Sequence, residues 1–101
     1  MDMRELPRLS TKETEILGTL IGAREMYGLE IARASEGRIK TGTLYVTLNR
    51  MEDKGLISSR EAECARVDGA PRRRMYRVTA QGARAMSDLA TFYMRLAPQR
   101  A

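Results

Sequence analysis

The stretch that decides the fold is Lys40-Thr41-Gly42-Thr43-Leu44-Tyr45-Val46-Thr47-Leu48-Asn49-Arg50-Met51-Glu52-Asp53-Lys54-Gly55. Its spacing predicts a helix over 41–54, because Leu44, Leu48 and Met51 recur at helical intervals and form one apolar stripe. We expect Thr41 to cap the start of this helix and Gly55 to end it.

The other side of this predicted helix is small and lightly polar. It presents Gly42, Thr43, Val46, Asn49 and Arg50, with Tyr45 on the flank. A short helix that is anchored in the core by an apolar face, and that presents a small and lightly polar face to solvent, fits the major groove of DNA. We therefore interpret the 41–54 helix as a DNA recognition helix.

The chain has 101 residues, of which 43% are hydrophobic and 31% are charged. This composition is typical of a globular rather than a disordered protein. The length predicts a single small domain. A domain of this size buries a smaller share of its surface than a larger one, so dimerisation is a common remedy for a small core.

Several classes of site are disfavoured by what the sequence lacks. The chain has no histidine and one cysteine, Cys64, which argues against a disulfide framework and the common metal sites. It also lacks a phosphate loop and the usual catalytic constellations, so we expect neither an enzyme nor a cofactor. Without a long apolar run or a secretion signal, we expect a cytoplasmic protein with no membrane partner.

The net charge of +5 is concentrated in the middle of the chain. Residues 38–54 contain four basic and two acidic side chains, residues 60–77 contain six basic and three acidic ones, and the remainder is balanced. A run of charge is usually a solvated face. A segregation this complete instead favours an anionic partner such as nucleic acid.

A first helix is predicted after a flexible leader over residues 1–9. Ser10 and Glu13 have the spacing of a capping box, which starts a helix that runs to about residue 23. Its apolar face should be buried in the core and consists of Ile16, Leu17, Leu20 and Ile21.

A second, short helix is predicted over 27–36, after a connector at 24–26. Gly37 should end it, and Ile39 in the following turn should reach the core. The residues expected to be buried are Leu29, Ile31 and Ala32. Two helices joined by a short turn, the second with a groove-compatible face, match the helix-turn-helix pattern.

After the recognition helix the sequence changes to β character. Residues 56–64 and 73–78 predict the two strands of a hairpin, with turn-forming residues at 67–71 between them. The tip and the return strand contain Arg66, Arg72, Arg73 and Arg74. A basic hairpin after a helix-turn-helix is typical of a wing that contacts DNA. The alternative is an ordinary exposed hairpin whose arginines keep an edge strand from aggregating.

A last helix is predicted from about residue 80 to 97, with Thr79 as its cap and Pro98 beyond its end. Near Phe92 it is apolar almost all round, so it needs more than one neighbour. We predict a dimer interface over Met86, Leu89, Phe92, Tyr93 and Leu96. The alternative is a helix wrapped entirely on the core of its own monomer.

The predicted fold class is therefore mainly α with a β-hairpin: a winged helix-turn-helix domain plus a C-terminal dimerisation helix. We expect the flexible leader over 1–9, the DNA-binding domain over 10–79, and the dimerisation helix and tail over 80–101.

From Tyr27 to Gly82 the sequence resembles the PadR family of bacterial transcriptional regulators. The matching blocks are Tyr27-Gly28-Leu29-Glu30-Ile31, Gly42-Thr43-Leu44-Tyr45 with Leu48, Glu52-Asp53-Lys54-Gly55-Leu56-Ile57, and Arg72-Arg73-Arg74-Met75-Tyr76-Arg77-Val78-Thr79 with Gly82. With one helix after the wing, the chain is similar to the small subgroup of that family.

The resemblance implies a winged helix-turn-helix that dimerises through its terminal helices and represses at a palindromic operator. It also implies that Tyr45 contacts DNA, with Thr43 and the wing arginines beside it. The chain departs from the family in having Val46 where proline usually follows that tyrosine. It also lacks the tryptophan on which some small members stack flat aromatic ligands between subunits.

We expect Asn49 and Arg50 to read bases, because asparagine pairs bidentately with adenine and arginine with guanine. Val46 could touch a thymine methyl group. The predicted contacts to the DNA backbone are Lys40, Thr41, Thr43, Tyr45, Arg72, Arg73 and Arg74. An apolar effector between the terminal helices and a redox role for Cys64 are further hypotheses, against the simpler roles of dimer core and structural cysteine.

Two other functions stay open at the level of sequence. One is a winged helix that binds an acidic protein rather than DNA. The other is a small DNA binder of low sequence preference. Binding to DNA and binding to an acidic protein differ in their dependence on length and in their requirement for sequence. Comparing operator with random DNA in the presence of competitor separates the low-specificity binder from a sequence-specific repressor.

Overall fold

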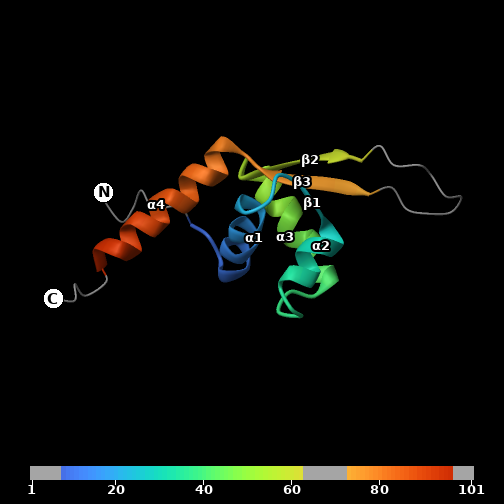
Figure 1. Cartoon of the computed structure of the whole chain (residues 1–101), viewed down its shortest axis with the longest axis horizontal. Coiled ribbons are helices and arrows are strands. Elements are labelled where there is room, and N and C mark those ends of the chain that lie inside the picture. The colour runs from blue at the N-terminus through green and yellow to red at the C-terminus, as the bar shows by residue number, and fades with distance from the viewer. Residues whose placement is uncertain (1–7, 63–72, 97–101) are drawn as a thin grey trace, which may run out of the picture.

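The computed structural model describes residues 8–62 and 73–96. Along the chain it contains α1 (Thr11–Ile21), β1 (Met26–Tyr27), α2 (Gly28–Ala34), α3 (Thr41–Asp53), β2 (Ile57–Glu61), β3 (Arg74–Val78) and α4 (Ala80–Leu96). Helices α1, α2 and α3 gather beside the sheet, whereas α4 and the β2–β3 hairpin extend in opposite directions (Figure 1). This arrangement is the predicted winged helix-turn-helix with a C-terminal helix.

The sheet has three antiparallel strands in the order β1-β3-β2. The hairpin of β2 and β3 was predicted, and its register pairs Ile57 with Val78 and Glu61 with Arg74. The third strand was not predicted. Met26 pairs with Tyr76, so the prediction that residues 24–26 are only a connector is wrong. A two-residue strand has no periodicity of its own, and its pairing partner lies far along the chain.

Helix α1 begins at the predicted capping box. The amide of Glu13 donates to the hydroxyl of Ser10 at 3.1 Å, and the amide of Ser10 donates back to the Glu13 carboxylate at 2.9 Å. Ile16, Leu17 and Leu20 are fully buried, as expected. Ile21 was also expected in the core but is 47% exposed, because it occupies the last position of the helix and lies beyond the packed stripe.

Helix α2 is shorter than predicted at both ends. Tyr27 belongs to β1, and the helix ends at Ala34, followed by positive φ values at Glu36 and Gly37. Leu29 was expected in the core but is 49% exposed. The buried stripe of this segment consists of Gly28, Ile31 and Ser35, spaced by three and four residues, and Leu29 points away from it.

One core unites the elements. Its buried side chains come from α1, α2, α3, the β2–β3 hairpin and α4, and Ile39 joins them as predicted, with 3% exposure. Within the described residues, no helix is long and apolar enough to span a bilayer.

Thr79 starts α4, as predicted, and also fastens it to the end of α3. Its hydroxyl accepts from the amide of Gly82 at 3.0 Å and donates to the carbonyl of Gly55 at 2.6 Å. Its own amide donates to the carbonyl of Leu56 at 3.1 Å. The direction in which α4 leaves the domain is therefore fixed by hydrogen bonds to the α3–β2 junction.

Candidate nucleic-acid interface

Helix α3 is held firmly on one side and open on the other. Leu44, Leu48 and Met51 are fully buried in the core. On the opposite side Val46 is 59% exposed and Tyr45 is 40% exposed. Asn49 and Arg50 are exposed as well, and the predicted site residues Lys40 and Thr41 are exposed at the helix start. The helix can therefore approach a ligand without giving up any core contact.

The start of α3 differs from the prediction. Lys40, not Thr41, occupies the N-cap position, and its carbonyl accepts from the amide of Leu44 at 2.8 Å. The prediction that Thr41 caps the helix is wrong, because Thr41 is already the first helical residue and follows an extended Lys40. No side chain caps this end and its first turn contains no acidic residue. The positive end of the helix dipole is thus left for an anion.

The end of α3 agrees with the prediction. Gly55 has a φ of 78° and its amide donates to the carbonyl of Glu52, while the amide of Leu56 donates to the carbonyl of Met51. This pair of bonds is a Schellman motif, which favours glycine at its left-handed position.

Four predicted site residues meet around one hollow of about 530 Å³ between α2, α3 and β3. They are Tyr45, Asn49, Arg73 and Arg74. Its remaining lining consists of Tyr27, Gly28, Leu29, Glu30, Arg33 and Tyr76. The hollow therefore combines aromatic rings with three guanidinium groups and a single carboxylate, next to the exposed face of the recognition helix.

Not every predicted residue lines this hollow. Val46 and Arg50 lie on the exposed face of α3 outside it. Lys40 and Thr41 border a second, more open depression beside Arg33. Thr43 is half-buried, and its carbonyl accepts from the hydroxyl of Thr47 at 2.8 Å. The predicted wing residues Arg66 and Arg72 and the sulfur of Cys64 lie outside the described residues.

The two described wing arginines have different surroundings. The guanidinium carbon of Arg73 lies 5.3 Å from the centre of the Tyr27 ring, a cation–π distance. The guanidinium of Arg74 donates twice to the hydroxyl of Ser59, at 2.8 and 3.1 Å. Ser59 in turn donates to the carboxylate of Glu52 on α3. Arg74 thus belongs to a chain of hydrogen bonds that joins the wing to the recognition helix.

Tyr76 also lines the hollow and is 4% exposed. Burial raises the pKa of its hydroxyl, and the nearby Arg74 offsets part of that rise. The group therefore stays protonated at neutral pH.

Six residues that line the hollow were not predicted as site residues, and Arg33 and Tyr27 are the two of these whose side chains pair with the chemistry of the site. Arg33 belongs to α2, which was predicted only as a structural helix, and Tyr27 belongs to β1, which was not predicted as a strand. A basic residue on the exposed side of the helix before the recognition helix was the available indication for Arg33. Nothing in the local sequence indicated that Tyr27 and Arg73 would meet, because they come together through sheet pairing.

The positive excess of the middle segments is partly neutralised by acids from the start of the chain. The pairs are Arg38 with Glu15, Arg60 with Glu25 and Lys54 with Glu13. These three cations were counted toward an anionic partner, but in the fold each has a carboxylate beside it. The lining of the hollow contains three arginines and one acid, Glu30.

The pair between Lys54 and Glu13 ties the end of α3 to the start of α1. The ammonium nitrogen lies 2.9 Å from a carboxylate oxygen, and the Glu13 side chain is 4% exposed. Burial alone would raise the pKa of this carboxyl, but hydrogen bonds from the Ser10 amide and from Lys54 outweigh it, so the pKa lies below its ordinary value. Glu13 is consequently ionised at neutral pH.

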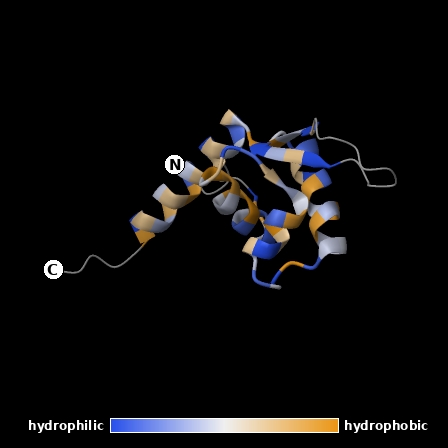
Figure 2. Ribbon diagram, turned by 45° about the vertical axis from the view of Figure 1, so that its right-hand side comes forward, coloured by the Kyte–Doolittle hydropathy of each residue, from blue (hydrophilic) through white to orange (hydrophobic). Residues whose placement is uncertain are grey.

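The predicted dimer face divides along the length of α4. Gly82 and Ala85 are buried and Met86 packs against the domain core. Farther along, Leu89 and Phe92 are half-buried, and Tyr93, Met94 and Leu96 are 63, 77 and 63% exposed. Hydrophobic residues continue along the part of α4 that projects from the domain (Figure 2). The first half of the helix thus packs on its own domain, while the second half is uncovered.

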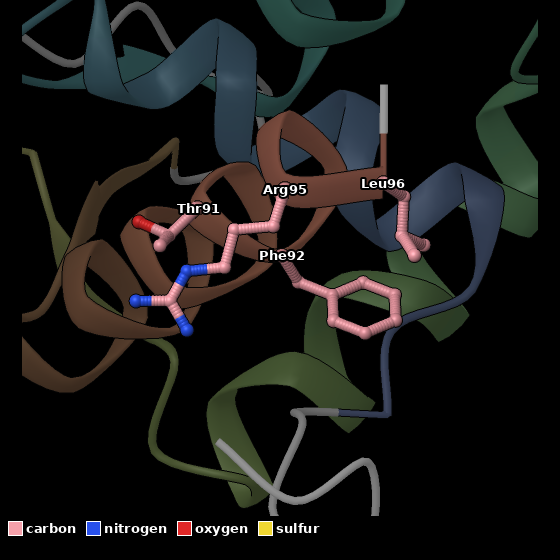
Figure 3. A pocket seen from close by; sticks show the side chains of 4 residues that line it. All are labelled: Thr91, Phe92, Arg95 and Leu96. Atoms are coloured by element: carbon pink, nitrogen blue, oxygen red, sulfur yellow. The ribbon is translucent and has the colours of Figure 1, made fainter. Parts of the chain in front are cut away.

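Aromatic side chains cluster on this second half. The rings of Phe92 and Tyr93 meet edge to face with centres 5.9 Å apart. A small hollow of about 260 Å³ is lined by Thr91, Phe92, Arg95 and Leu96 (Figure 3). All four belong to the last turns of α4, so a partner would meet a mainly apolar surface with one cation at its edge.

Comparison with known proteins places the chain among regulators. The family model described as "Transcriptional regulator PadR-like family" matches residues 16–88. Among curated proteins, none matches the chain.

Solved structures of similar fold agree with the family match. A PadR family transcription regulator from Clostridium difficile is 30% identical to this chain, with a TM-score of 0.65. The match covers 82% of this chain and 88% of the regulator's chain. A PadR family transcriptional regulator from Eggerthella lenta is 28% identical, with coverages of 82% and 74% and the same TM-score of 0.65. A transcriptional regulator from Clostridium thermocellum is 27% identical, with coverages of 88% and 91% and a TM-score of 0.64.

Proposed function

Because the chain belongs to the PadR-like family of transcriptional regulators, we propose that it is a homodimeric repressor that binds a palindromic operator in the cytoplasm. The family consists of regulators rather than enzymes, which agrees with a site of aromatic and basic side chains. The observation that supports the proposal most is the open, lightly polar face of α3 beside the basic hollow.

In the proposed complex each subunit places α3 in one major groove. Asn49 and Arg50 are both exposed on the open face and have the donors and acceptors that distinguish base edges. Val46, also exposed, supplies an apolar contact for a thymine methyl group. These three residues determine the sequence preference.

Contacts to the DNA backbone surround this reading face. Thr41, Thr43 and the uncapped start of α3 face one phosphate, and the hydroxyl of Tyr45 donates to another. The cations that add attraction irrespective of sequence are Lys40, Arg72, Arg73 and Arg74. If about 6–8 phosphates are neutralised per dimer, affinity falls steeply with salt concentration.

The dimer forms through the uncovered half of α4. Tyr93 and Leu96 are the most exposed members of the proposed interface, and Phe92 and Leu89 continue it toward the domain. Met86, which packs on the domain's own core, lies at its inner edge. Two subunits joined in this way read half-sites about one helical turn apart, or a multiple of that spacing.

Release from the operator requires a signal that favours one arrangement of the subunits over another. For that signal we retain the hypothesis of an apolar effector between the two α4 helices, near Met86, Phe92, Tyr93 and Met94. The same side chains serve equally as a plain dimer core, and effector screening by thermal shift distinguishes the two roles.

Selection of bound duplexes from a random DNA library tests the proposal. A sequence-specific dimer enriches a palindrome whose half-sites follow the spacing above, and Asn49→Ala or Arg50→Ala relaxes the preference at one position in each half-site. A control is Lys12→Ala, at an exposed position of α1, which should leave the enriched sequence unchanged. Absence of any enriched sequence would instead favour a DNA binder of low specificity.

A further inference from the structure

Gly28 is glycine at a position where the backbone does not require it. It is buried, it begins α2, and the glycines with positive φ among the described residues are Gly37 and Gly55. Alanine is a better helix former than glycine by up to about 1 kcal/mol. The reason for glycine must therefore lie in what surrounds the position.

The space for a side chain at Gly28 is occupied by the ring of Tyr45. A Cβ atom built there would lie 2.8 Å from the Tyr45 hydroxyl oxygen, 2.9 Å from Cε1 and 3.0 Å from Cζ. All three atoms belong to the outer end of one side chain, and that side chain is 40% exposed. A methyl group at position 28 would displace the ring into solvent, while the backbone of α2 and α3 could stay in place.

The position of the hydroxyl matters because of what surrounds it. Tyr45 borders the hollow together with Asn49 and Arg73, between the recognition helix and the wing. An O–H donor reaches an oxygen acceptor only within roughly 2.5–3.0 Å, and the bond weakens steeply with misalignment. A small displacement of the ring is therefore enough to lose a contact to phosphate.

We propose that Gly28 is a positioning residue for DNA binding, which acts by leaving the space in which the Tyr45 ring lies and so directs its hydroxyl toward the DNA backbone. The proposal rests on the proposed function, because it needs Tyr45 to contact DNA. Gly28 itself touches no DNA. Its replacement changes affinity only through the tyrosine.

A double-mutant cycle tests this coupling. Operator affinity is measured by fluorescence anisotropy for the wild type, Gly28→Ala, Tyr45→Ala and the double variant. A hydrogen bond to a charged group corresponds to a change of roughly 10- to 100-fold in affinity, so Tyr45→Ala should weaken binding about tenfold or more. Gly28→Ala should weaken it by at least about fivefold in the wild type and have no effect in the Tyr45→Ala background.

A matched control and a spectroscopic measurement separate positioning from loss of structure. Gly18→Ala on α1 adds the same methyl group where no atom lies within 4 Å, so its DNA affinity should equal that of the wild type. In protein labelled with 3-fluorotyrosine, the four tyrosines give separate ¹⁹F signals that Tyr→Phe variants assign. Gly28→Ala should shift the Tyr45 signal more than the signals of the three other tyrosines.

Each outcome decides between the proposals. Unchanged affinity in Gly28→Ala, or an equal loss with and without the Tyr45 ring, would overturn the role of Gly28 while leaving the DNA-binding proposal intact. Unchanged affinity in Tyr45→Ala would remove Tyr45 from the interface, and the role of Gly28 with it. If Gly28→Ala does not fold, recovery of folding in the double variant supports the steric coupling, and continued unfolding contradicts it.

Discussion

Replacing Gly82 with alanine should destabilise the protein, because the start of α4 lies against the backbone of Leu56 with no room for a side chain there. A Cβ atom at this position would lie 2.1 Å from the carbonyl oxygen of Leu56 and 2.9 Å from Cγ2 of Val78. A carbon–oxygen contact is normally about 3.3 Å or longer, so α4 must move by roughly 1 Å. Unlike the tyrosine ring at Gly28, the obstacle is backbone.

The expected change in the free energy of unfolding combines two destabilising contributions and one stabilising contribution. Overpacking of this kind costs about 1–3 kcal/mol. The movement also lengthens the hydrogen bond from the Thr79 amide to the Leu56 carbonyl, now 3.1 Å, and such a bond contributes about 1 kcal/mol. The higher helix propensity of alanine stabilises the variant by up to about 1 kcal/mol. We expect a net loss of about 2 kcal/mol, which lowers the melting temperature by roughly 10 °C for a domain of this size.

Thermal and urea denaturation at one fixed protein concentration measure this effect, since dimerisation makes stability depend on concentration. Gly18→Ala is the matched control. No atom lies within 4 Å of the added methyl group, so helix propensity should make this variant as stable as the wild type or more stable by up to about 1 kcal/mol. A Gly82→Ala protein as stable as Gly18→Ala would refute the argument that close backbone packing fixes α4.

Three further variants test the polar contacts and the proposed interface. Glu13→Gln should lower the free energy of unfolding by about 1 kcal/mol at neutral pH, a value reduced for the exposure of Lys54. Because folding lowers the pKa of Glu13, the stabilisation by its carboxylate is present above the ordinary value of 4.5 and is lost as the pH falls through the folded pKa. Urea denaturation across a pH series should therefore show the variant and the wild type converging in acid, and a constant difference would contradict this. Ser59→Ala removes the group that joins Arg74 to α3, so we expect operator affinity to fall about 3- to 10-fold; equal anisotropy curves for variant and wild type would exclude a role for this link. Tyr93→Glu places a charge on the uncovered half of α4, where the side chain is 63% exposed, and should give a folded monomer by analytical ultracentrifugation, whereas a persistent dimer would move the interface elsewhere.

Local sequence features were enough to predict the helices that build the site. The capping box at Ser10, the apolar stripe of α3, the stop at Gly55 and the cap at Thr79 all depend on residues within one or two turns of each other. Such features depend mainly on near neighbours in the chain, although the predicted cap at Thr41 was wrong because Lys40 takes that position. They fix the recognition helix and its anchored side without knowledge of the fold.

Features that depend on distant pairing could not be predicted in the same way. Strand β1 exists only because Met26 and Tyr27 pair with β3, and that pairing also brings Arg73 over the Tyr27 ring. Leu29 has an apolar side chain but a position outside the buried stripe of α2, so composition alone placed it wrongly.

Charge counting had a similar limit. The excess in the middle of the sequence suggested an anionic partner, but the count could not tell free cations from paired ones. Folding places Glu13, Glu15 and Glu25 beside three of those cations. What distinguishes the candidate interface is the location of its arginines around one hollow next to α3.

The most direct test of the central claim is fluorescence anisotropy with DNA from upstream of the protein's own gene. A random duplex of equal length is titrated beside it, and both are measured at several salt concentrations. The account predicts tight binding to the upstream duplex, two subunits per site, and much weaker, more salt-sensitive binding to the random one. Equal binding to both duplexes, or binding to neither at moderate salt, would contradict a sequence-specific repressor that reads DNA with α3.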